Sequence, residues 1–388
     1  MSNSIHSDRL LTVRVSARRF ERSPFEQKWL GPDTVMGVYA GRYYSVFNGE
    51  DVEGGYWTLR RKAVLYDVPE RPVEISGPDA ERFLEHVFAR RISTLQEGRG
   101  RYAIACDHMG HLFMDGVLFR LAQNRFWYVQ PDGALETWLL AYSAGFDVSV
   151  SDPRSRVLQI QGPASLAIMS AATDGAITQA MGYFHSGFFT IAGQQVYVSR
   201  TGWTGEMGYE VYTQGAATDC GRLWDRLMSA GQPHGMIFGS ISSMEMRRIE
   251  AGILDNGTDF DLTMTPFEAG LGSFVDLDKP DFIGRKALLA ADRQAKRLFG
   301  LKCPGGIPGY REVILDGARA VGHVTAGAWS PFLASGIGYV RFDAPGDWAG
   351  SRLQVKTAEN GVLDCEIIDL PFYDVEKRIP RGLDRSEV

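Results

Sequence analysis

The densest group of residues that could carry chemistry is the glycine-rich segment TGWTGEMGYEVY, residues 201–212. Gly202, Gly205 and Gly208 predict a tight loop between two strands, where the backbone can approach a flat ligand closely. Glu210 lies at the start of a strand otherwise made of Tyr and Val. A carboxylate there can accept two parallel N–H bonds from a cyclic amidine edge, such as that of a pterin. The alternative is that Glu210 lies on the wet face of an ordinary strand.

Two further groups contain charged residues that could face a ligand. One begins at Arg247-Arg248 and continues through NGTDF (256–260) and TPFEAG (265–270). Taken alone, it indicates a helix end, a Gly/Asn turn and an acidic loop. The other is Asp115, which enters a strand of apolar residues within FMDG. Because an unpaired buried carboxylate is costly, Asp115 is expected either at a strand end in water or in a pocket that uses its charge.

The common catalytic motifs are absent from the sequence. There is no GxxxxGK(S/T) phosphate loop, no GxGxxG after a strand, no GxSxG elbow and no HExxH. Nucleotide hydrolysis, Rossmann-type dehydrogenation, α/β-hydrolase and zincin chemistry therefore lose support. Cys106, His108 and His111 lie close together, but the other histidines are scattered and supply no further ligands. We expect a polar turn between two strands there and no metal site.

The composition is that of a globular protein with large cores. The chain has 388 residues, of which 44% are hydrophobic and 23% charged, so disorder is excluded as a default. Lys and Arg number 41 against 47 Asp and Glu, a net charge of -6, so a nucleic-acid partner is not expected. The N-terminus is polar and no run of 18 apolar residues occurs, so no membrane partner is expected. The four cysteines form no CxxC pair, which predicts reduced thiols in a cytoplasmic protein.

Hydrophobic periodicity predicts a first α+β unit from about residue 72 to 151. A strand at 73–75 precedes a helix with the apolar stripe Phe83, Leu84, Val87 and Phe88. The elements expected after it are strands near 102–106, 118–121 and 126–129, a helix over 134–144 and a strand at 147–150. The order β-α-β-β-α-β indicates the split βαβ of a ferredoxin-like unit.

A second α+β unit and a barrel are expected to follow. The elements of the second unit are a strand at 157–161, a helix ending at Met169, strands at 188–191, 196–200 and 209–212, and helices at 217–228 and 241–251. Residues 1–290 are expected to form one region, which begins with an N-terminal arm over residues 1–35. The polar stretch 291–296 separates this region from the tail at 296–375. The tail has short apolar strands near 299–302, 313–315, 320–325, 337–340, 353–355 and 363–367. With Gly, Pro and Asp turns between them, these strands predict a small all-β barrel.

Four motifs occur in an order that is specific to a known family. They are LQIQGPAS, TGWTGEMGYEVY, RRIEAGILDNGTDF with TPFEAGL, and VTAGAWSPFLASGIGYV. With them the chain resembles the aminomethyltransferase family of the glycine cleavage T-protein, from about Arg19 to Phe372. The segments ARRFERSPFEQKW, VYAGRYYSVF and IIDLPF are more similar to its dimethylsulfoniopropionate demethylase branch. The resemblance implies an α+β, three-domain folate-binding T-protein fold, in which two interleaved α+β domains and a C-terminal β-barrel surround a channel for tetrahydrofolate.

The resemblance also assigns roles to individual positions. Glu210 matches the glutamate that holds the pterin, and Trp203 takes the place of an aromatic residue beside the ring. Arg248 matches an arginine near the folate or the substrate, and Gln161 lies in a turn that borders the channel. These four residues are the expected cofactor-binding set, with tetrahydrofolate as the cofactor.

Asp115 matches the second acid of an Asp-Asp pair and is the expected catalytic residue, as acid, base or charge partner. Met114 stands where the first acid would be, which disfavours aminomethyl transfer from a lipoyl carrier. Met207 replaces another acidic residue of the family pattern. These two replacements predict a less anionic and more apolar site.

Aromatic residues near the expected channel entrance could contact the substrate. Tyr39, Tyr43, Tyr44 and Phe47 can face a cation with their π-surfaces or stack on an aryl group. The three tyrosines, with Met114, are the expected substrate-binding residues. Core packing is the alternative for this stripe.

The resemblance and the residues together predict a tetrahydrofolate-dependent demethylase or methyltransferase. It would move a one-carbon group from a small organic donor, of the onium or aryl methyl ether class, to tetrahydrofolate, and holding both partners together would supply most of the rate. The first alternative is a folate-independent lyase that releases formaldehyde from an aromatic hydroxymethyl substrate. The second is a non-catalytic folate-binding or iron–sulfur-assembly helper, whose signature KGCYxGQ is absent. The chain is expected to be a monomer or a homodimer.

Overall fold

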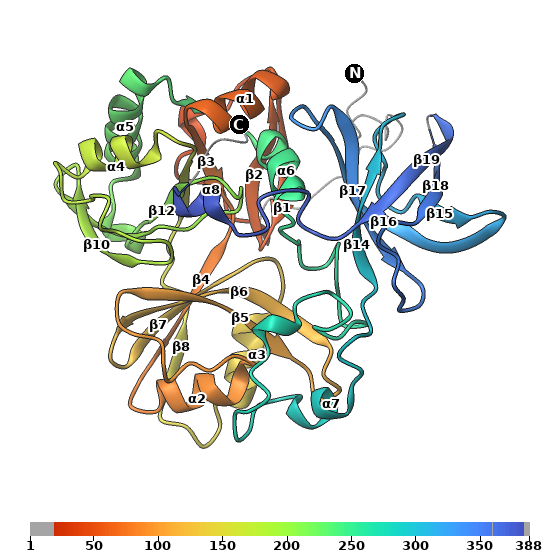
Figure 1. The fold of residues 1–388 in the computed structure, drawn as a ribbon. Coiled ribbons are helices and arrows are strands. Elements are labelled where there is room, and N and C mark those ends of the chain that lie inside the picture. The colour runs from red at the N-terminus through yellow and green to blue at the C-terminus, as the bar shows by residue number, and fades with distance from the viewer. Residues whose placement is uncertain (1–18, 359, 384–388) are drawn as a thin grey trace.

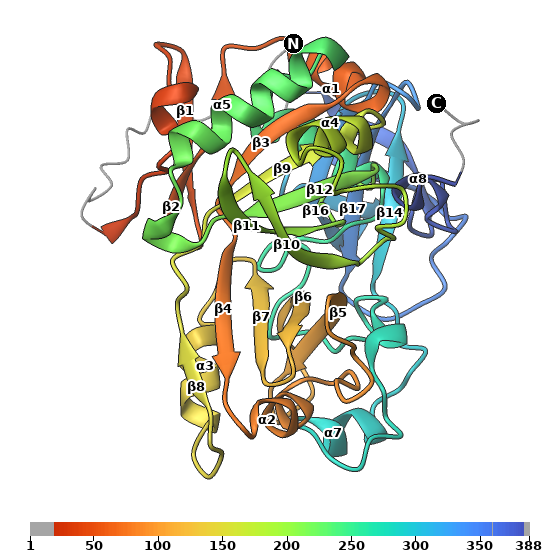
Figure 2. The same cartoon turned by 90° about the vertical axis from the view of Figure 1, so that its left-hand side faces the viewer.

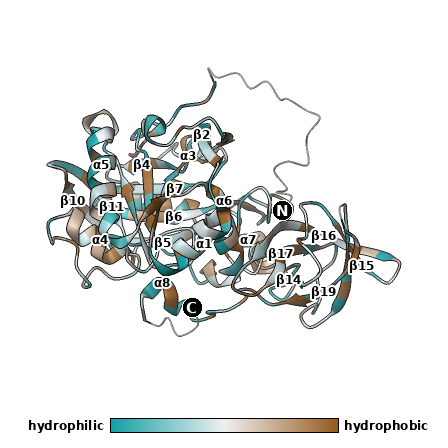
Figure 3. Cartoon of the chain, turned by 90° about the horizontal axis from the view of Figure 1, so that it is seen from above, coloured by the Kyte–Doolittle hydropathy of each residue, from teal (hydrophilic) through white to brown (hydrophobic). Residues whose placement is uncertain are grey.

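The computed structural model describes residues 19–358 and 360–383, which form two sheets with their helices and a barrel (Figure 1). A six-stranded sheet stands above a five-stranded sheet, and the closed barrel lies beside them. Viewed from above, the barrel projects to one side of the two sheets (Figure 3). Of the expected N-terminal arm, residues 1–18 lie outside the described residues. The described part is anchored by Phe25 and Trp29, which are buried in the core of the six-stranded sheet.

The five-stranded sheet is the expected ferredoxin-like unit with one additional strand. Its order is β5-β6-β7-β4-β8, and all neighbouring strands are antiparallel. The bounds are β4 (Arg71–Ser76), β5 (Arg99–Cys106), β6 (Leu112–Ala122), β7 (Arg125–Gln130) and β8 (Ser149–Ser151). Because β4 lies between β7 and β8, the two halves interleave as a split βαβ requires. The expected order β-α-β-β-α-β lacks the edge strand β5, which pairs along its whole length with β6.

Two helices, α2 (Ala80–Val87) and α3 (Leu135–Tyr142), cover one face of this sheet. They bury the apolar stripe of α2 and Leu135 and Leu139 of α3 against the sheet, and α3 is shorter at both ends than its periodicity predicts. The other face carries Phe119 and Trp127 into a second core, which it shares with the six-stranded sheet. That face therefore points toward the centre of the molecule.

The six-stranded sheet has the order β10-β11-β12-β9-β3-β13. Its strands are β3 (Val64–Val68), β9 (Val157–Gln161), β10 (Ser186–Ile191), β11 (Gln194–Ser199), β12 (Gly208–Tyr212) and β13 (Ile237–Phe238). Figure 2 shows α4 (Ser165–Ala172) and α5 (Cys220–Gly231) over one face of the sheet. Leu158 and Ile160 of β9 face these helices. Since side chains alternate along a strand, Gln159 points to the opposite face, toward the centre of the molecule.

Residues 34–68 contain elements that the sequence patterns did not indicate. They are the hairpin β1 (Thr34–Tyr39) and β2 (Arg42–Asn48), helix α1 (Val52–Arg61) and strand β3. The strand β2 has aromatic residues on both faces, which hides its period of two, and α1 contains two adjacent glycines. The short helices α7 (Arg285–Ala290) and α8 (Arg378–Arg381) were also not expected. No described helix is long and apolar enough to cross a membrane.

The C-terminal strands close into the predicted barrel, in the order β14-β17-β16-β15-β18-β19. They are β14 (Leu298–Cys303), β15 (Val313–Asp316), β16 (Arg319–Ser330), β17 (Ser335–Phe342), β18 (Arg352–Thr357) and β19 (Gly361–Ile368). Helix α6 (Ile241–Glu250) packs against β16 and β17. At this junction Arg60 and Arg247 pair with Glu206 and Glu250, and all four side chains are buried.

Candidate functional site

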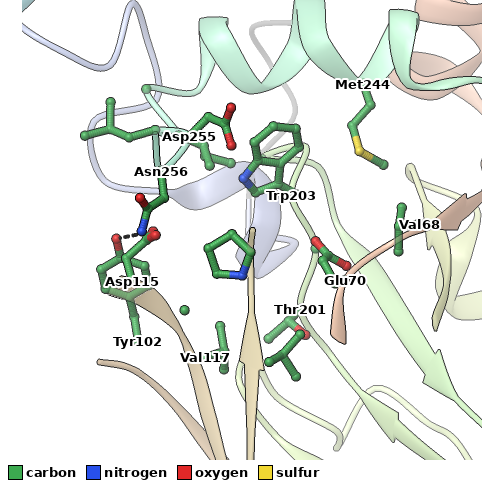
Figure 4. A pocket seen from close by; sticks show the side chains of 18 of the residues that line it. Val68, Glu70, Tyr102, Asp115, Val117, Thr201, Trp203, Met244, Asp255 and Asn256 are labelled. Carbon is green, nitrogen blue, oxygen red and sulfur yellow. Dashed lines mark hydrogen bonds between the residues drawn. The ribbon is translucent and has the colours of Figure 1, made fainter. Parts of the chain in front are cut away.

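A cavity of about 790 Å³ lies where the two sheets and the C-terminal segment meet. Its wall is built by the β1–β2 hairpin, the β3–β4 crossover, β6, β7, β12, α6, and the segments 201–205, 252–256, 269–274 and 370–380. This volume is in the range of small-molecule sites. Figure 4 shows Glu70 and Thr201 on one side of Trp203, and Tyr102, Asp115 and Asn256 on the other. The two groups are called here the Glu210 end (Glu70, Thr201 and Glu210) and the Asp115 end (Tyr39, Tyr102, Asp115, Asp255 and Asn256).

Glu210 is held in one orientation by four donors. Ser199 Oγ, Thr201 Oγ1 and Tyr212 OH donate to its Oε2 at 3.2, 2.6 and 2.5 Å. Gln159 Nε2 donates to its Oε1 at 3.1 Å, because Gln159 on β9 lies directly opposite Glu210 on β12. Burial raises the pKa of Glu210, and the three hydroxyl donors oppose that shift. Glu210 thus presents a fixed carboxyl group to the cavity.

Glu70 is a second carboxyl group at the same end, and sequence reasoning missed it. It follows Pro69 in the crossover from β3 to β4, and Arg42 Nη1 donates to its main-chain oxygen at 2.7 Å. Gln159 Nε2 donates to its Oε2 at 3.3 Å. Burial and then the charge of Glu210 raise the pKa of Glu70 to about 8. No local pattern marks Glu70, since it meets Glu210 only through the pairing of β3, β9 and β12.

Trp203 lies in the cavity wall, and Arg248 supports it from behind. The Arg248 guanidinium carbon is 5.1 Å from the indole centroid, a cation–π distance. Arg248 itself is outside the wall, 2% exposed, and donates to Asp259 and Glu245 at 2.7 and 2.5 Å. Arg248, which was expected near the folate or the substrate, therefore lies behind Trp203 and outside the cavity wall, where the two carboxylates hold it.

Gln161 is also fully buried and lies under the 201–208 loop instead of in the cavity wall. Its Nε2 donates to Thr201 O at 3.2 Å, and its Oε1 accepts from Thr204 Oγ1 at 2.8 Å. A Cβ at Gly202 would lie 2.1 Å from Gln161 Oε1, and one at Gly208 would lie 2.3 Å from its Cδ. These two glycines make room for Gln161, and Gly202 also lines the cavity, so the expected close approach of this loop to a flat ligand stays a prediction.

The Asp115 end contains two carboxyl groups, each hydrogen-bonded by a tyrosine. Tyr102 OH donates to Asp115 Oδ2 at 2.8 Å, the dashed line in Figure 4. Tyr39 OH donates to Asp255 Oδ1 at 3.1 Å. Sequence reasoning placed Tyr39 and Asp115 in the site and included Asn256 in a group that could face a ligand, but it missed Tyr102 and Asp255. Asp255 and Asn256 lie inside the quoted motif RRIEAGILDNGTDF, so the motif was the signal that could have found them.

Both acids of this end titrate near neutral pH. Burial raises the pKa of Asp115 to about 7, against the Tyr102 hydrogen bond, with a further increase from the charge of Asp255. Burial raises the pKa of Asp255 to about 6, although the Arg248 charge lowers it. A group entering this end can therefore meet a carboxylate or a carboxylic acid, depending on pH.

Two of the expected substrate contacts line the cavity and two do not. Tyr39 and Tyr44 are in the wall, with ring centroids 6.5 Å apart. Tyr43 faces away, its ring 5.7 Å from that of Phe20, because neighbouring side chains of β2 point to opposite faces. Met114 is 1% exposed and packs in the core under α2 and α3, because Asp115 takes the cavity-facing position of β6. The expectations for Tyr43 and Met114 are thus corrected.

The cavity wall contains more acids than the two, Asp115 and Glu210, that the sequence placed in the site. It includes five acids: Glu70, Asp115, Glu210, Glu245 and Asp255. Met114 and Met207, from which an apolar site was expected, are both outside that wall. The acids of this cavity thus come from positions other than 114 and 207, and the expectation of a less anionic site than the family pattern stays a prediction.

The region around Cys106, His108 and His111 is a turn between β5 and β6. His111 Nδ1 lies 3.4 Å from Asp107 Oδ2, and no group of three His, Cys, Asp or Glu residues in the described part of the chain could hold a metal ion. The four cysteines are free, three of them buried. The site chemistry of the described residues therefore rests on carboxyl, amide, phenol and indole groups.

Two family models match the chain. The GCVT N-terminal domain matches residues 33–279, and the glycine cleavage T-protein C-terminal barrel domain matches residues 296–374. An aminomethyltransferase of Streptomyces coelicolor is 33% identical over 94% of this chain and 100% of its own length. One of Caldanaerobacter subterraneus is 30% identical over 84% of this chain and 88% of its own length.

Two further similarities extend this set. A trimethylamine-oxide aldolase of Ruegeria pomeroyi is 32% identical over 84% of this chain, which spans only 44% of that protein. Among solved structures, the glycine cleavage system aminomethyltransferase T from Bartonella henselae matches with a TM-score of 0.82, over 92% of this chain and 98% of that one. At 23% identity that match shows the fold.

Proposed function

The chain belongs to the aminomethyltransferase family of the glycine cleavage T-protein, and from this premise we propose that it moves a methyl group from a small organic donor to tetrahydrofolate. The observation that carries the proposal is one cavity with two acidic ends on either side of Trp203. Such a cavity suits a transfer between two bound molecules, because holding donor and acceptor in line lowers the activation barrier by up to about 7–11 kcal/mol. In this proposal the acceptor occupies the Glu210 end and the donor the Asp115 end.

The Glu210 end fits tetrahydrofolate. A carboxylate with fixed oxygens can accept two parallel N–H bonds from the 2-amino and N3 positions of a pterin. Trp203 offers a flat apolar surface beside it, and the Val68 and Val117 side chains continue the wall (Figure 4). When bound, tetrahydrofolate supplies a nucleophilic N5 amine. The chain's own contribution is to orient the ring and to exclude water around it.

The Asp115 end fits a donor that carries positive charge. Asp115 and Asp255 are two acids within one apolar wall, and the rings of Tyr39 and Tyr44 lie beside them. A buried cation is costly unless carboxylates and π-surfaces offset it, and this end offers both. We therefore place onium donors ahead of aryl methyl ethers, in agreement with the segments that are similar to the dimethylsulfoniopropionate demethylase branch. For an ether donor, Asp115 in its protonated form would act on the leaving oxygen instead.

A second candidate function is a folate-independent lyase that releases formaldehyde. The similarity to a protein named trimethylamine-oxide aldolase favours it, although this chain corresponds to less than half of that protein. In this reading the Asp115 end would hold the whole substrate, an aromatic hydroxymethyl compound. The pH-sensitive carboxyl groups would then move the proton on which the release of the one-carbon unit depends.

Product analysis separates the two functions. The purified protein is incubated with dimethylsulfoniopropionate, an aryl methyl ether and an aryl hydroxymethyl compound, each with and without tetrahydrofolate. We expect 5-methyltetrahydrofolate from the sulfonium compound only when tetrahydrofolate is present, and less of it from Glu210→Gln. Free formaldehyde formed at the same rate with and without tetrahydrofolate would establish the lyase instead.

A further inference from the structure

The Glu210 end holds two carboxyl groups where one suffices to bind an amidine edge. Glu70 and Glu210 accept hydrogen bonds from the same amide nitrogen, Gln159 Nε2, at 3.3 and 3.1 Å. The orientation of that amide is set from its other side, because Gln159 Oε1 accepts the backbone N–H of Trp203 at 3.3 Å. One hydrogen of the NH₂ group therefore points to each carboxyl group. A charge on one of these carboxyl groups disfavours a charge on the other, and the charge of Glu210 is, after burial, the second cause that raises the pKa of Glu70.

The two carboxyl groups differ in the donors that stabilise a charge. Glu210 accepts from Ser199, Thr201 and Tyr212 in addition to Gln159. Within residues 19–358 and 360–383, the Glu70 carboxyl group accepts from Gln159 alone, and no Lys or Arg side chain forms an ion pair with either acid. Hydrogen bonds to the ionised form favour it, so Glu210 keeps the charge and Glu70 keeps the proton. The high pKa of Glu70, about 8, agrees with this assignment.

Building on the proposed use of tetrahydrofolate, we propose that Glu70 is a second pterin-binding residue, and that it binds the ring as a neutral carboxylic acid. The edge of the ring has donors at N3 and on the 2-amino group, and an acceptor at N1. Ionised Glu210 accepts N3–H and one amino hydrogen. Protonated Glu70 donates its O–H to N1 and accepts the second amino hydrogen with its carbonyl oxygen. The pair thus recognises both sides of the amino group while only one negative charge is buried.

This arrangement makes binding depend on the proton of Glu70. An ionised Glu70 would face the lone pair of N1, so affinity should fall as pH rises above the pKa of Glu70, about 8. The other titratable groups that face Glu70 and Glu210 keep their charge state up to pH 9. Burial raises the pKa of Tyr39 and Tyr212 well above the usual value and that of Tyr183 to about 12, and Arg42, whose pKa is about 10, stays charged.

Three groups elsewhere in the cavity wall titrate in or next to the same range. Burial raises the pKa of Asp115 to about 7 and that of Asp255 to about 6. Burial lowers the pKa of Lys377 to about 8, and its Nζ donates to Ala251 O at 2.6 Å. A pH profile of the natural protein alone would therefore combine Glu70 with these three groups. The test must compare variants of Glu70 that share Asp115, Asp255 and Lys377, so that the contributions of those three groups cancel.

The test is a titration of binding affinity against pH. The probe is 5-formyltetrahydrofolate, which is stable in air and has the same N1, 2-amino and N3 edge. Its Kd is measured by calorimetry from pH 6.5 to 9 for the natural protein, Glu70→Gln, Glu70→Ala and Glu210→Gln. Melting temperatures confirm that each variant is folded.

Each variant has a distinct expected result. The natural protein loses affinity by about tenfold per pH unit above about pH 8. Glu70→Gln binds within about threefold of it at pH 7 and lacks that loss, because an amide offers the same donor and acceptor without a titration. Glu70→Ala binds about 10- to 100-fold more weakly at pH 7. Glu210→Gln binds weakly at every pH.

Two results would overturn the inference while leaving the proposed function intact. One is the same pH dependence in Glu70→Gln as in the natural protein. The other is natural affinity in folded Glu70→Ala. If the natural protein itself does not bind the probe at any pH, the proposed function fails, and the role of Glu70 fails with it. A 1-deaza analogue, which lacks the N1 acceptor but keeps the 2-amino group, supplies the matched ligand: its affinities for the natural protein and for Glu70→Ala should differ less than those of the probe, because only the hydrogen bond to the amino group remains to be lost.

Discussion

The buried carboxyl group of Asp115 makes the folding stability of the protein depend on pH, because its charged form is disfavoured in the folded state. Its side chain is 8% exposed, and burial raises its pKa from 3.8 to about 7. The folded protein therefore binds this proton more tightly than the unfolded chain does. The stability that this group contributes is fully present below about pH 4 and is lost as pH rises to about 7, by up to about 4 kcal/mol.

The substitution Asp115→Asn should separate the two properties. Because the amide stays neutral, we expect the variant to melt at a higher temperature than the natural protein at pH 8, with the difference shrinking toward pH 4. Turnover should fall by a factor of about 10² to 10⁴ if Asp115 is a charge partner, acid or base for the donor. Calorimetric melting and an initial-rate assay at pH 5 and 8 check both. A large loss of stability with normal turnover in the folded fraction would instead make Asp115 a structural residue.

Short sequence motifs identified some residues of this site, whereas the place of Glu70 depends on how the strands of the sheet pair. Trp203, Glu210 and Asp115 all line the cavity, and each was found because it stands in a short motif of fixed spacing. Glu70 has no such motif. Its chemistry depends on Gln159, which belongs to a strand that pairs with β3 from far along the chain. A single sequence does not contain that register, so no local pattern could have identified Glu70.

At the scale of elements, β2 offers a test in which two neighbouring tyrosines have different roles. Tyr44 lines the cavity, whereas Tyr43 lies on the other face of the strand. We expect Tyr44→Leu to raise the KM for a cationic donor about 3- to 30-fold, since it removes a π-surface worth about 0.5–2 kcal/mol. Tyr43→Leu serves as the matched control and should leave KM within about twofold. Equal effects of the two substitutions would show that neither ring contacts the donor directly.

The loop 201–208 depends on glycine for a packing reason, and this can be tested by substitution. A Cβ at Gly202 would overlap the Gln161 amide, so Gly202→Ala should displace Gln161 and cost about 1–3 kcal/mol of stability. Since the same amide bonds Thr201, folate affinity should fall as well. Gly221→Ala in α5 is the control, because a Cβ there meets nothing closer than 3.4 Å. If Gly202→Ala is as stable as the control, Gln161 does not restrict this loop.

The elements that the sequence predicted well are those with one buried face. The stripe of α2, the strand 157–161 and the barrel strands all alternate or repeat with a clear period, and each is found where it was expected. The hairpin β1–β2 was missed because it has one face against the cavity and the other against the arm, so apolar residues occur on both. The segment of β5 was expected to be a strand, but the predicted order β-α-β-β-α-β did not count it. A ferredoxin-like unit has only two strands between its helices, whereas this sheet has three.

At the scale of the whole molecule, Glu250 joins the barrel to the sheets. Its carboxylate accepts from Tyr56, Ser330 and Tyr373 at 2.7, 2.5 and 2.5 Å, and Arg60 pairs with it at 3.2 Å. Ser330 belongs to the barrel, and Tyr56 and Arg60 belong to α1. Removing one member of such a network leaves the other charges buried and unbalanced.

The substitution Glu250→Ala should therefore cost about 3–5 kcal/mol. We expect calorimetry to show a lower melting temperature and a barrel transition that separates from that of the sheets. Ser330→Ala is the milder control, because it removes a single hydrogen bond, worth about 1 kcal/mol. An unchanged melting profile for Glu250→Ala would mean that apolar contacts alone hold the barrel in place.

The pairing of β3 with β9 has a consequence for how this protein can change. The two strands are antiparallel neighbours, and their last paired residues are Val68 and Val157. Residues 69–156, which include the whole five-stranded sheet, therefore form an insertion between two neighbouring strands of the six-stranded sheet. The inserted segment carries Asp115 and Tyr102, and Glu70 stands at its first turn, whereas Gln159, Trp203 and Glu210 belong to the host sheet and its loop. A lineage could therefore reshape the inserted sheet, and with it the Asp115 side of the cavity, while Gln159, Trp203 and Glu210 of the host sheet are inherited unchanged.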